Sequence, residues 1–203
     1  NNMATNSKTS IINDIKKYSL ITKNEYELDF IKQTIDFLQN NDNYLYRTNL
    51  KWHLTNSAWI TDKTYSYVLL IHHKKLDKWL QPWWHCEIVD NSLQEWACRE
   101  AREETWLNHF ILKDNWIFDI DVHPIPAKWE EPEHFHYDVR FWLIWDTHSL
   151  ENIDKNEIIN DSTLLFYDKK DILNLNFKND NFNNNNLHYF GYSIHWKNNY
   201  YLV

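Results

Sequence analysis

Hydrophobic positions recur with helical spacing in three parts of the chain. A helix over Glu25–Leu38 is predicted by four apolar residues that lie three or four positions apart, namely Leu28, Ile31, Ile35 and Leu38. A shorter helix is predicted over Ile11–Tyr18, and Ser92–Thr105 has the clearest helical pattern of the sequence. These segments are separated by stretches with a different periodicity.

Strand-like segments lie between and after the predicted helices. Tyr67–Ile71 is continuously apolar over a length that is typical of a buried strand. The predicted extended segments are Leu54–Ile60, Tyr65–His72, Trp79–Leu80, Ile117–Val122 and Phe135–Trp145. A short helix at Lys169–Leu175 and an Asn-rich loop at Asn179–Asn186 follow. Helices and strands therefore interleave along the chain, as they do in α/β proteins.

Size and hydrophobicity limit the class of protein. The chain has 203 residues, 43% of them hydrophobic, which suits one domain with its own core. We expect residues 1–45 to form a helical segment that packs on a domain formed by residues 46–203. No apolar stretch reaches the ~18 residues of a membrane span, and the polar N-terminus shows no secretory signal. We therefore expect a cytoplasmic protein with no membrane partner.

Net charge and cysteine usage exclude further classes. The formal net charge is -8, whereas proteins that bind nucleic-acid polymers normally carry a basic surface. The negative net charge is compatible with a small phosphorylated substrate, because cations held by carboxylates would neutralise its phosphates. The two cysteines, Cys86 and Cys98, have no metal-ligand spacing and form no disulfide framework.

The helix over Ser92–Thr105 carries three glutamates at positions i, i+3 and i+4. Glu100, Glu103 and Glu104 therefore lie on one helical face, where their like charges repel unless a cation lies among them. Oxygen-only ligands at this density suit Mg²⁺ or Mn²⁺. The other interpretation is a charge-rich helix face in solvent. Leu93, Ala97 and Ala101 occupy the opposite side and are expected to pack on a sheet.

The sequence around these glutamates resembles the Nudix box, whose pattern is G-x5-E-x7-R-E-U-x-E-E-x-G-U, with U apolar. Arg99-Glu100-Ala101-Arg102-Glu103-Glu104 is similar to its central part, and Leu107 fills its last apolar position. Asp90 stands for the first glutamate, with one residue more than usual before Arg99. Upstream, Gln81-Pro82-Trp83-Trp84-His85-Cys86-Glu87 looks like the P-G-G-H-x-E turn of the family. The similarity to one bacterial Nudix subgroup extends roughly from Leu50 to Trp145.

The resemblance implies a fold and an activity. The expected fold is α/β, a Nudix-type α/β/α sandwich around a mixed β-sheet. The implied activity is Mg²⁺-dependent cleavage of a diphosphate linkage in a nucleoside diphosphate derivative or a nucleoside triphosphate. Glu100, Glu103 and Glu104 would ligate the Mg²⁺ (or Mn²⁺), with Glu103 and Glu104 as the catalytic pair, while Asp90 and Arg99 would orient the helix and its carboxylates. The resemblance does not predict the oligomeric state or the exact substrate.

Groups outside the helix are candidates for substrate contact or for the general base. In this family the base is a box glutamate or one from a distant loop, so Glu130, Glu131 and Glu133 are loop candidates for the base, with a solvated acidic loop as the alternative. His136 is a candidate for substrate contact. His134 and His136 alternate with aromatic residues and therefore share one strand face. A hydrogen-bonded strand histidine, a substrate contact and a zinc site are the open alternatives for these two, and for His72, His73 and His123.

The chain departs from the family pattern at its glycines. It has 1 glycine and 12 tryptophans, where average usage predicts roughly 14 glycines. Trp83 and Trp84 stand at the paired-glycine turn and Trp106 at the glycine that closes the helix, while Trp52 and Trp129 also stand where the subgroup tends to have glycine. Either the protein has lost these glycines and is impaired, or UGA codons that the source organism reads as glycine have been translated as tryptophan.

Three functions compete. The first is a catalytic Nudix hydrolase, favoured by the three box glutamates. The second is a catalytically impaired Nudix-fold module that binds a nucleotide without turnover, which genuine tryptophans at 83, 84 and 106 would favour. The third, an isomerase of the isoprenoid type, lacks an identifiable cysteine and glutamate motif.

Overall fold

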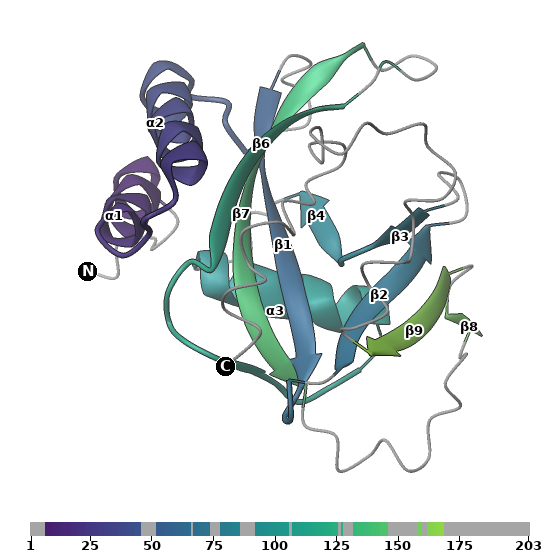
Figure 1. Ribbon diagram of the computed structural model, residues 1–203. Helices are drawn as coiled ribbons and strands as arrows, with labels where there is room; N and C mark the ends of the chain where they lie inside the picture. The colour runs from purple at the N-terminus through teal and green to yellow at the C-terminus, as the bar shows by residue number, and fades with distance from the viewer. Residues whose placement is uncertain are drawn as a thin grey trace.

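The computed structural model describes residues 7–45, 52–65, 67–73, 78–85, 92–105, 107–125, 127, 132–145, 158–159 and 162–168. These segments form three helices and nine strands (Figure 1). None of the described helices is long and apolar enough to cross a membrane.

The three helices begin at residues whose side chains satisfy free backbone amides. In α1 (Lys8–Ser19) the Ser7 side chain accepts a hydrogen bond from the Ser10 amide, and in α2 (Glu25–Asn40) the Asn24 side chain accepts from the second and third residues of the helix. In α3 (Leu93–Thr105) the Ser92 hydroxyl accepts from the Glu95 amide at 3.1 Å. These are N-caps, which stabilise a helix start by about 1 kcal/mol each.

The strands form one sheet that contains both parallel and antiparallel pairs. They are β1 (Trp52–Asp62), β2 (Tyr67–His73), β3 (Lys78–Leu80), β4 (Trp83–His85), β5 (Phe110–Leu112), β6 (Asp119–Ile125), β7 (His134–Trp145), β8 (Ile158–Ile159) and β9 (Ser162–Asp168). The main order is β5-β7-β1-β2-β9-β8, with β3 on β2, β4 on β1 and β6 on β7. The expected mixed α/β fold around a mixed sheet is confirmed.

The parallel pair of β1 and β7 is the centre of the sheet. The two strands stay in register from Trp52↔Phe135 to Asp62↔Trp145, although their residues are more than 80 positions apart in sequence. Since side chains alternate between the two faces of a strand, this register decides which residues from β1, β6 and β7 share a face.

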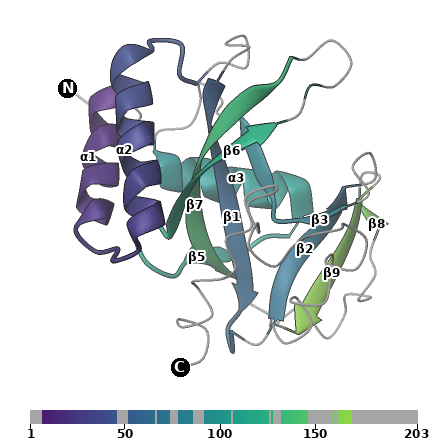
Figure 2. The ribbon, with the colours of Figure 1, turned by 45° about the horizontal axis from the view of Figure 1, so that its top comes forward.

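One face of these strands is apolar and carries the helices. A single cluster of buried residues joins α1, α2 and α3 with the sheet, through Leu54 of β1, Ile120 of β6 and Val139 and Phe141 of β7. On the same face Phe37 of α2 stacks on Tyr137, with ring centroids 4.3 Å apart. A second cluster joins Ala101 of α3 to Leu143 and Trp145. The described helices therefore all pack on the apolar face, with α2 beside β6, α1 beside α2, and α3 beside β1 (Figures 1 and 2).

The other face of the same strands is polar and nevertheless buried. It presents the side chains at 53, 55 and 57 of β1, 119, 121 and 123 of β6, and 134, 136, 138 and 140 of β7, all of which are no more than 8% exposed. Buried polar groups are destabilising unless they are hydrogen-bonded or paired.

Several predicted elements differ from the structure. Leu28 is one of the four apolar residues whose spacing predicted α2, yet it is 38% exposed. The helix instead turns Glu27 inward, where it accepts hydrogen bonds from Tyr18 and from the Ile120 amide. The strand expected at Ile117–Val122 begins at Asp119, two residues later. Strands β4, β5, β8 and β9 were not expected, and the predicted helix Lys169–Leu175 and loop Asn179–Asn186 lie outside the described residues.

Candidate active site

Helix α3 presents the glutamates of the box-like sequence. Its buried side, formed by Leu93, Trp96, Ala97 and Ala101, packs in the two apolar clusters and fixes the rotation of the helix about its axis. The prediction that Leu93, Ala97 and Ala101 pack on the sheet is confirmed. Asp90, which stands for the first glutamate of the box, lies outside the described residues.

Arg99 holds two of the three glutamates. Its Nη2 lies 2.7 Å from Oε1 of Glu100, and its Nη1 donates to Oε2 of Glu103 at 2.8 Å. The Glu100 side chain is buried, whereas that of Glu103 is 55% exposed. One guanidinium therefore offsets part of the repulsion between two carboxylates and fixes their relative position.

Glu104 is the third carboxylate and is half-buried. Burial, and secondly the charge of Glu103, raise the pKa of Glu104 to about 7. A raised pKa means that the ionised form is destabilised here, which is the condition that a nearby cation would relieve. The helix thus combines one buried, one half-buried and one exposed carboxylate within two turns.

The other expected site residues are Glu131, Glu133 and His136. Glu131 is outside the described residues, and Glu133 is exposed just before β7. His136 is buried on the polar face of β7, whereas α3 packs with Val139 and Phe141 on the apolar face. The sheet therefore separates His136 from the face on which α3 packs.

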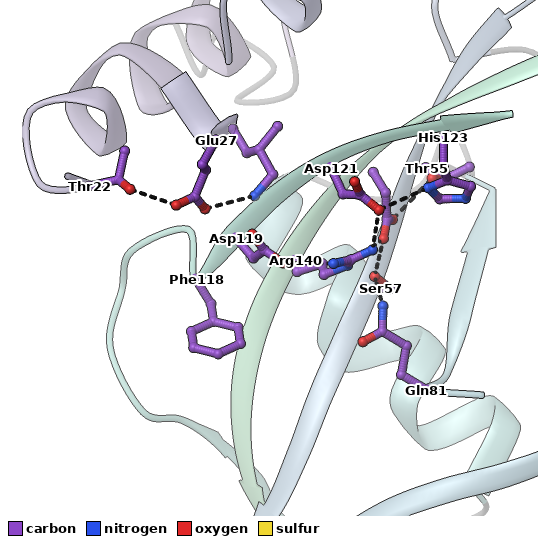
Figure 3. Close-up of polar contacts among 12 residues, drawn as sticks. Thr22, Glu27, Thr55, Ser57, Gln81, Phe118, Asp119, Asp121, His123 and Arg140 are labelled. Carbon is purple, nitrogen blue, oxygen red and sulfur yellow. Dashed lines mark hydrogen bonds and ion pairs between the residues drawn. The ribbon is translucent and has the colours of Figure 1, made fainter. Parts of the chain in front are cut away.

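The polar face of the sheet contains a network that the sequence did not predict. Its centre is Arg140, which is 4% exposed and donates to three carboxylates: Nη1 to Asp119 at 2.6 Å, Nη2 to Asp121 at 2.8 Å and Nε to Asp138 at 2.8 Å (Figure 3). Burial by itself would lower the pKa of Arg140, but the three aspartates outweigh it and raise that pKa. Burial would raise the pKa of Asp121, and Arg140 and His123 outweigh that effect and lower it.

The network continues to the segment before β4. Asp138 accepts from the Thr55 hydroxyl at 3.0 Å and from the Ser57 hydroxyl at 2.6 Å. Ser57 in turn accepts from Nε2 of Gln81 at 2.8 Å (Figure 3). Gln81 is two residues from Trp83, so the hydrogen bonds connect the buried aspartates to the turn that resembles the paired-glycine turn.

This turn is extended at the two tryptophans. Trp83 and Trp84 belong to β4 and pair antiparallel with Ser57 and Asn56 of β1. In the part of the chain that the structure describes, the only non-glycine residues with positive φ are Tyr65 and His109. The backbone conformation at positions 83 and 84 is therefore one that any residue with a side chain can adopt. Trp106 and Trp129 lie outside the described residues.

A signal for the polar network was present in the sequence. Asp119, Asp121 and His123 alternate along what the structure shows to be β6, and His134, His136, Asp138 and Arg140 along β7. Alternation of this kind predicts a shared polar face. Which strands are neighbours, and in which register, could not be read from it.

Comparisons with known proteins give only distant likenesses. No family model and no curated protein matches the sequence. Among solved structures, a hydrolase of the NUDIX family from Clostridium perfringens is 28% identical, with a TM-score of 0.39, over 60% of this chain and 85% of its own. A MutT protein from Bacillus halodurans is 18% identical, with a TM-score of 0.40, over 60% and 72% of the two chains. An Ap4A hydrolase from C. elegans is 10% identical, with a TM-score of 0.40, over 60% and 84%. TM-scores of this size do not assign a family, so the functional argument rests on the site.

Proposed function

We propose that the chain is a Nudix-type, Mg²⁺-dependent hydrolase that cleaves a diphosphate linkage in a nucleoside diphosphate derivative or a nucleoside triphosphate. The observation that carries the proposal is the array of Glu100, Glu103 and Glu104 on α3, with Arg99 between the first two. The substrate is a small nucleotide-like molecule, and the protein acts in the cytoplasm.

The donor set of α3 fits a hard divalent cation. All of its groups are carboxylate oxygens, which Mg²⁺ and Mn²⁺ prefer. The raised pKa of Glu104 is consistent with this assignment, because burial, and secondly the charge of Glu103, destabilise its ionised form and a bound cation would offset both effects. Glu100, Glu103 and Glu104 would hold the cation, which supplies positive charge that polarises phosphoryl oxygens and activates water.

The remaining residues position these groups. Arg99 keeps Glu100 and Glu103 in a fixed relation, and Asp90 would orient the start of the helix. Glu103 and Glu104 are the catalytic pair, since both are accessible to a bound substrate to a greater degree than buried Glu100. The general base is a glutamate of α3 or one from the loop that contains Glu131 and Glu133.

The test is hydrolysis of nucleoside diphosphate sugars, dinucleoside polyphosphates and nucleoside triphosphates, with and without Mg²⁺. We expect turnover only with the metal, and a loss of orders of magnitude in kcat for Glu103→Gln and for Glu104→Gln. Glu95→Gln, on the same helix but outside the array, is the matched control and should keep its activity. Unchanged activity in both array variants would refute the site.

The second candidate is a nucleotide-binding module without turnover. It is favoured by tryptophan at the paired-glycine turn, where large side chains would crowd a phosphate. The intact mass and peptide map of the protein from its native source decide whether glycine or tryptophan stands at positions 83, 84 and 106. If tryptophan is found there, and calorimetry shows nucleotide binding with no product formed, the binding module replaces the hydrolase.

A further inference from the structure

Three buried histidines converge on the polar face of the sheet. His53 is at the start of β1, and His134 and His136 are at the start of β7, where His53 is the register partner of His136. Their exposed fractions are 2%, 8% and 3%. One ring nitrogen from each lies within 4.8 Å of those from the other two. Two parallel strands that are distant in sequence thus bring three imidazoles to one point.

The hydrogen bond of His134 fixes which of its nitrogens faces the cluster. Its Nδ1 lies 2.9 Å from the Pro132 carbonyl oxygen, which can only accept, so Nδ1 carries the hydrogen. In the neutral ring Nε2 then has a lone pair directed at the cluster. A histidine that binds a metal commonly donates its other ring N–H to a backbone carbonyl in this way.

The spacing of the nitrogens is close to that of metal ligands. Nε2 of His134 lies 3.1 Å from Nε2 of His136, and two nitrogens on a tetrahedral zinc, each ~2.0–2.1 Å from it, are about 3.3 Å apart. The His53 ring is next to both, with its centroid 4.6 Å from that of His136 and 5.2 Å from that of His134.

The surroundings of the cluster are negatively charged. The Asp119, Asp121 and Asp138 carboxylates face a single guanidinium, which leaves the network with a formal charge of −2. Asp138 is two residues from His136 on the same strand face. His123, which contacts Asp121, also packs edge-on against His136, with their ring centroids 5.6 Å apart. A buried negative charge next to the imidazoles favours a dication among them.

We propose that His53, His134 and His136 bind one divalent transition-metal ion, with Zn²⁺ as the expected occupant. Three imidazole nitrogens suit Zn²⁺, whereas Mg²⁺ prefers oxygen ligands, so this site is chemically distinct from the carboxylate array of α3. The ion would fasten the start of β1 to the start of β7. The proposal does not depend on the hydrolase function.

The test starts from the full-length protein after treatment with a chelator, to which Zn²⁺ or Co²⁺ alone is added. We expect uptake of one equivalent, a higher Tm, and for Co²⁺ the visible absorption of a site with nitrogen ligands. His136→Asn and His53→Asn should weaken Zn²⁺ binding by at least about 100-fold, more than loss of an outer partner usually does. The exposed His109→Asn is the matched control and should bind as the wild type does.

X-ray absorption at the zinc edge of the loaded wild-type protein keeps the proposal testable if the variants do not fold. Three imidazoles at ~2.0–2.1 Å would support it. Fewer than three imidazoles, or sulfur ligands, would overturn it. So would equal binding by folded His136→Asn and wild type, or a wild-type Tm that Zn²⁺ does not change.

Discussion

Replacing Arg140 with methionine is the sharpest test of the buried network, because it removes one cation from three carboxylates. Methionine has a similar length and leaves Asp119, Asp121 and Asp138 without the guanidinium that each contacts at 2.6–2.8 Å. Breaking a buried ion pair by removing one partner costs about 3–5 kcal/mol. Since all three carboxylates lose the same partner, we expect the free energy of unfolding to fall by an amount near the upper end of this range, about 4–5 kcal/mol at pH 8.

The stability lost in Arg140→Met should be smaller at lower pH. In the wild type Asp121 has a lowered pKa, so its stabilisation is present above the ordinary aspartate pKa of about 4 and is lost only at lower pH. In Arg140→Met the Asp121 carboxylate lacks its cation, so burial should raise its pKa above that of the unfolded chain, and protonation should then stabilise the folded state. Each proton gained contributes about 1.4 kcal/mol per pH unit. The deficit at pH 5 should therefore be smaller than at pH 8 by at least about 1 kcal/mol.

Urea unfolding followed by tryptophan fluorescence at pH 8 and pH 5 measures the stability loss of Arg140→Met and its dependence on pH. Arg102→Met, at an exposed position of α3, is the control and should cost less than about 0.5 kcal/mol. Adding Asp121→Asn to Arg140→Met should recover part of the loss at pH 8. A loss below about 1 kcal/mol, or the same loss at both pH values, would show that the aspartates do not depend on Arg140.

Three further outcomes are expected. Tyr18→Phe should lower the free energy of unfolding by about 1.5–3 kcal/mol, because it removes a 2.5 Å hydrogen bond to a buried carboxylate of α2; Tyr26→Phe, at a 74% exposed position, should be neutral in the same urea titration. Phe37→Ala should cost about 3–5 kcal/mol, since the ring is 5% exposed and stacks on β7, and a cost equal to that of the half-exposed Phe135→Ala would contradict this packing. If the proposed Mg²⁺ site is correct, the Mg²⁺ concentration for half-maximal activity should rise about tenfold from pH 8 to pH 6, because Glu104, with a pKa of about 7, must lose a proton to bind the metal; a pH-independent Mg²⁺ requirement would count against Glu104 as a ligand.

The sequence alone determined the three helices and the spacing of the glutamates along α3. Apolar spacing was enough to predict the three helices, whereas their capping side chains at Ser7, Asn24 and Ser92 were identified in the structure. The positions of the glutamates on α3 follow from 3.6 residues per turn. These interactions join residues that are only a few positions apart in sequence, so the spacing of residue types is enough to predict them.

Only the tertiary structure decided what the polar strand residues do. The sequence predicted that His134 and His136 share a strand face, but not that Arg140 would contact three aspartates or that His53 would lie next to His134 and His136. These contacts depend on the parallel register of β1 with β7, and a shift of one residue would move every side chain to the other face. The register is set by packing of whole strands against three helices, and so by residues far apart in the sequence. For the same reason the inward turn of Glu27, which left Leu28 exposed, could not be read from the spacing of α2 itself.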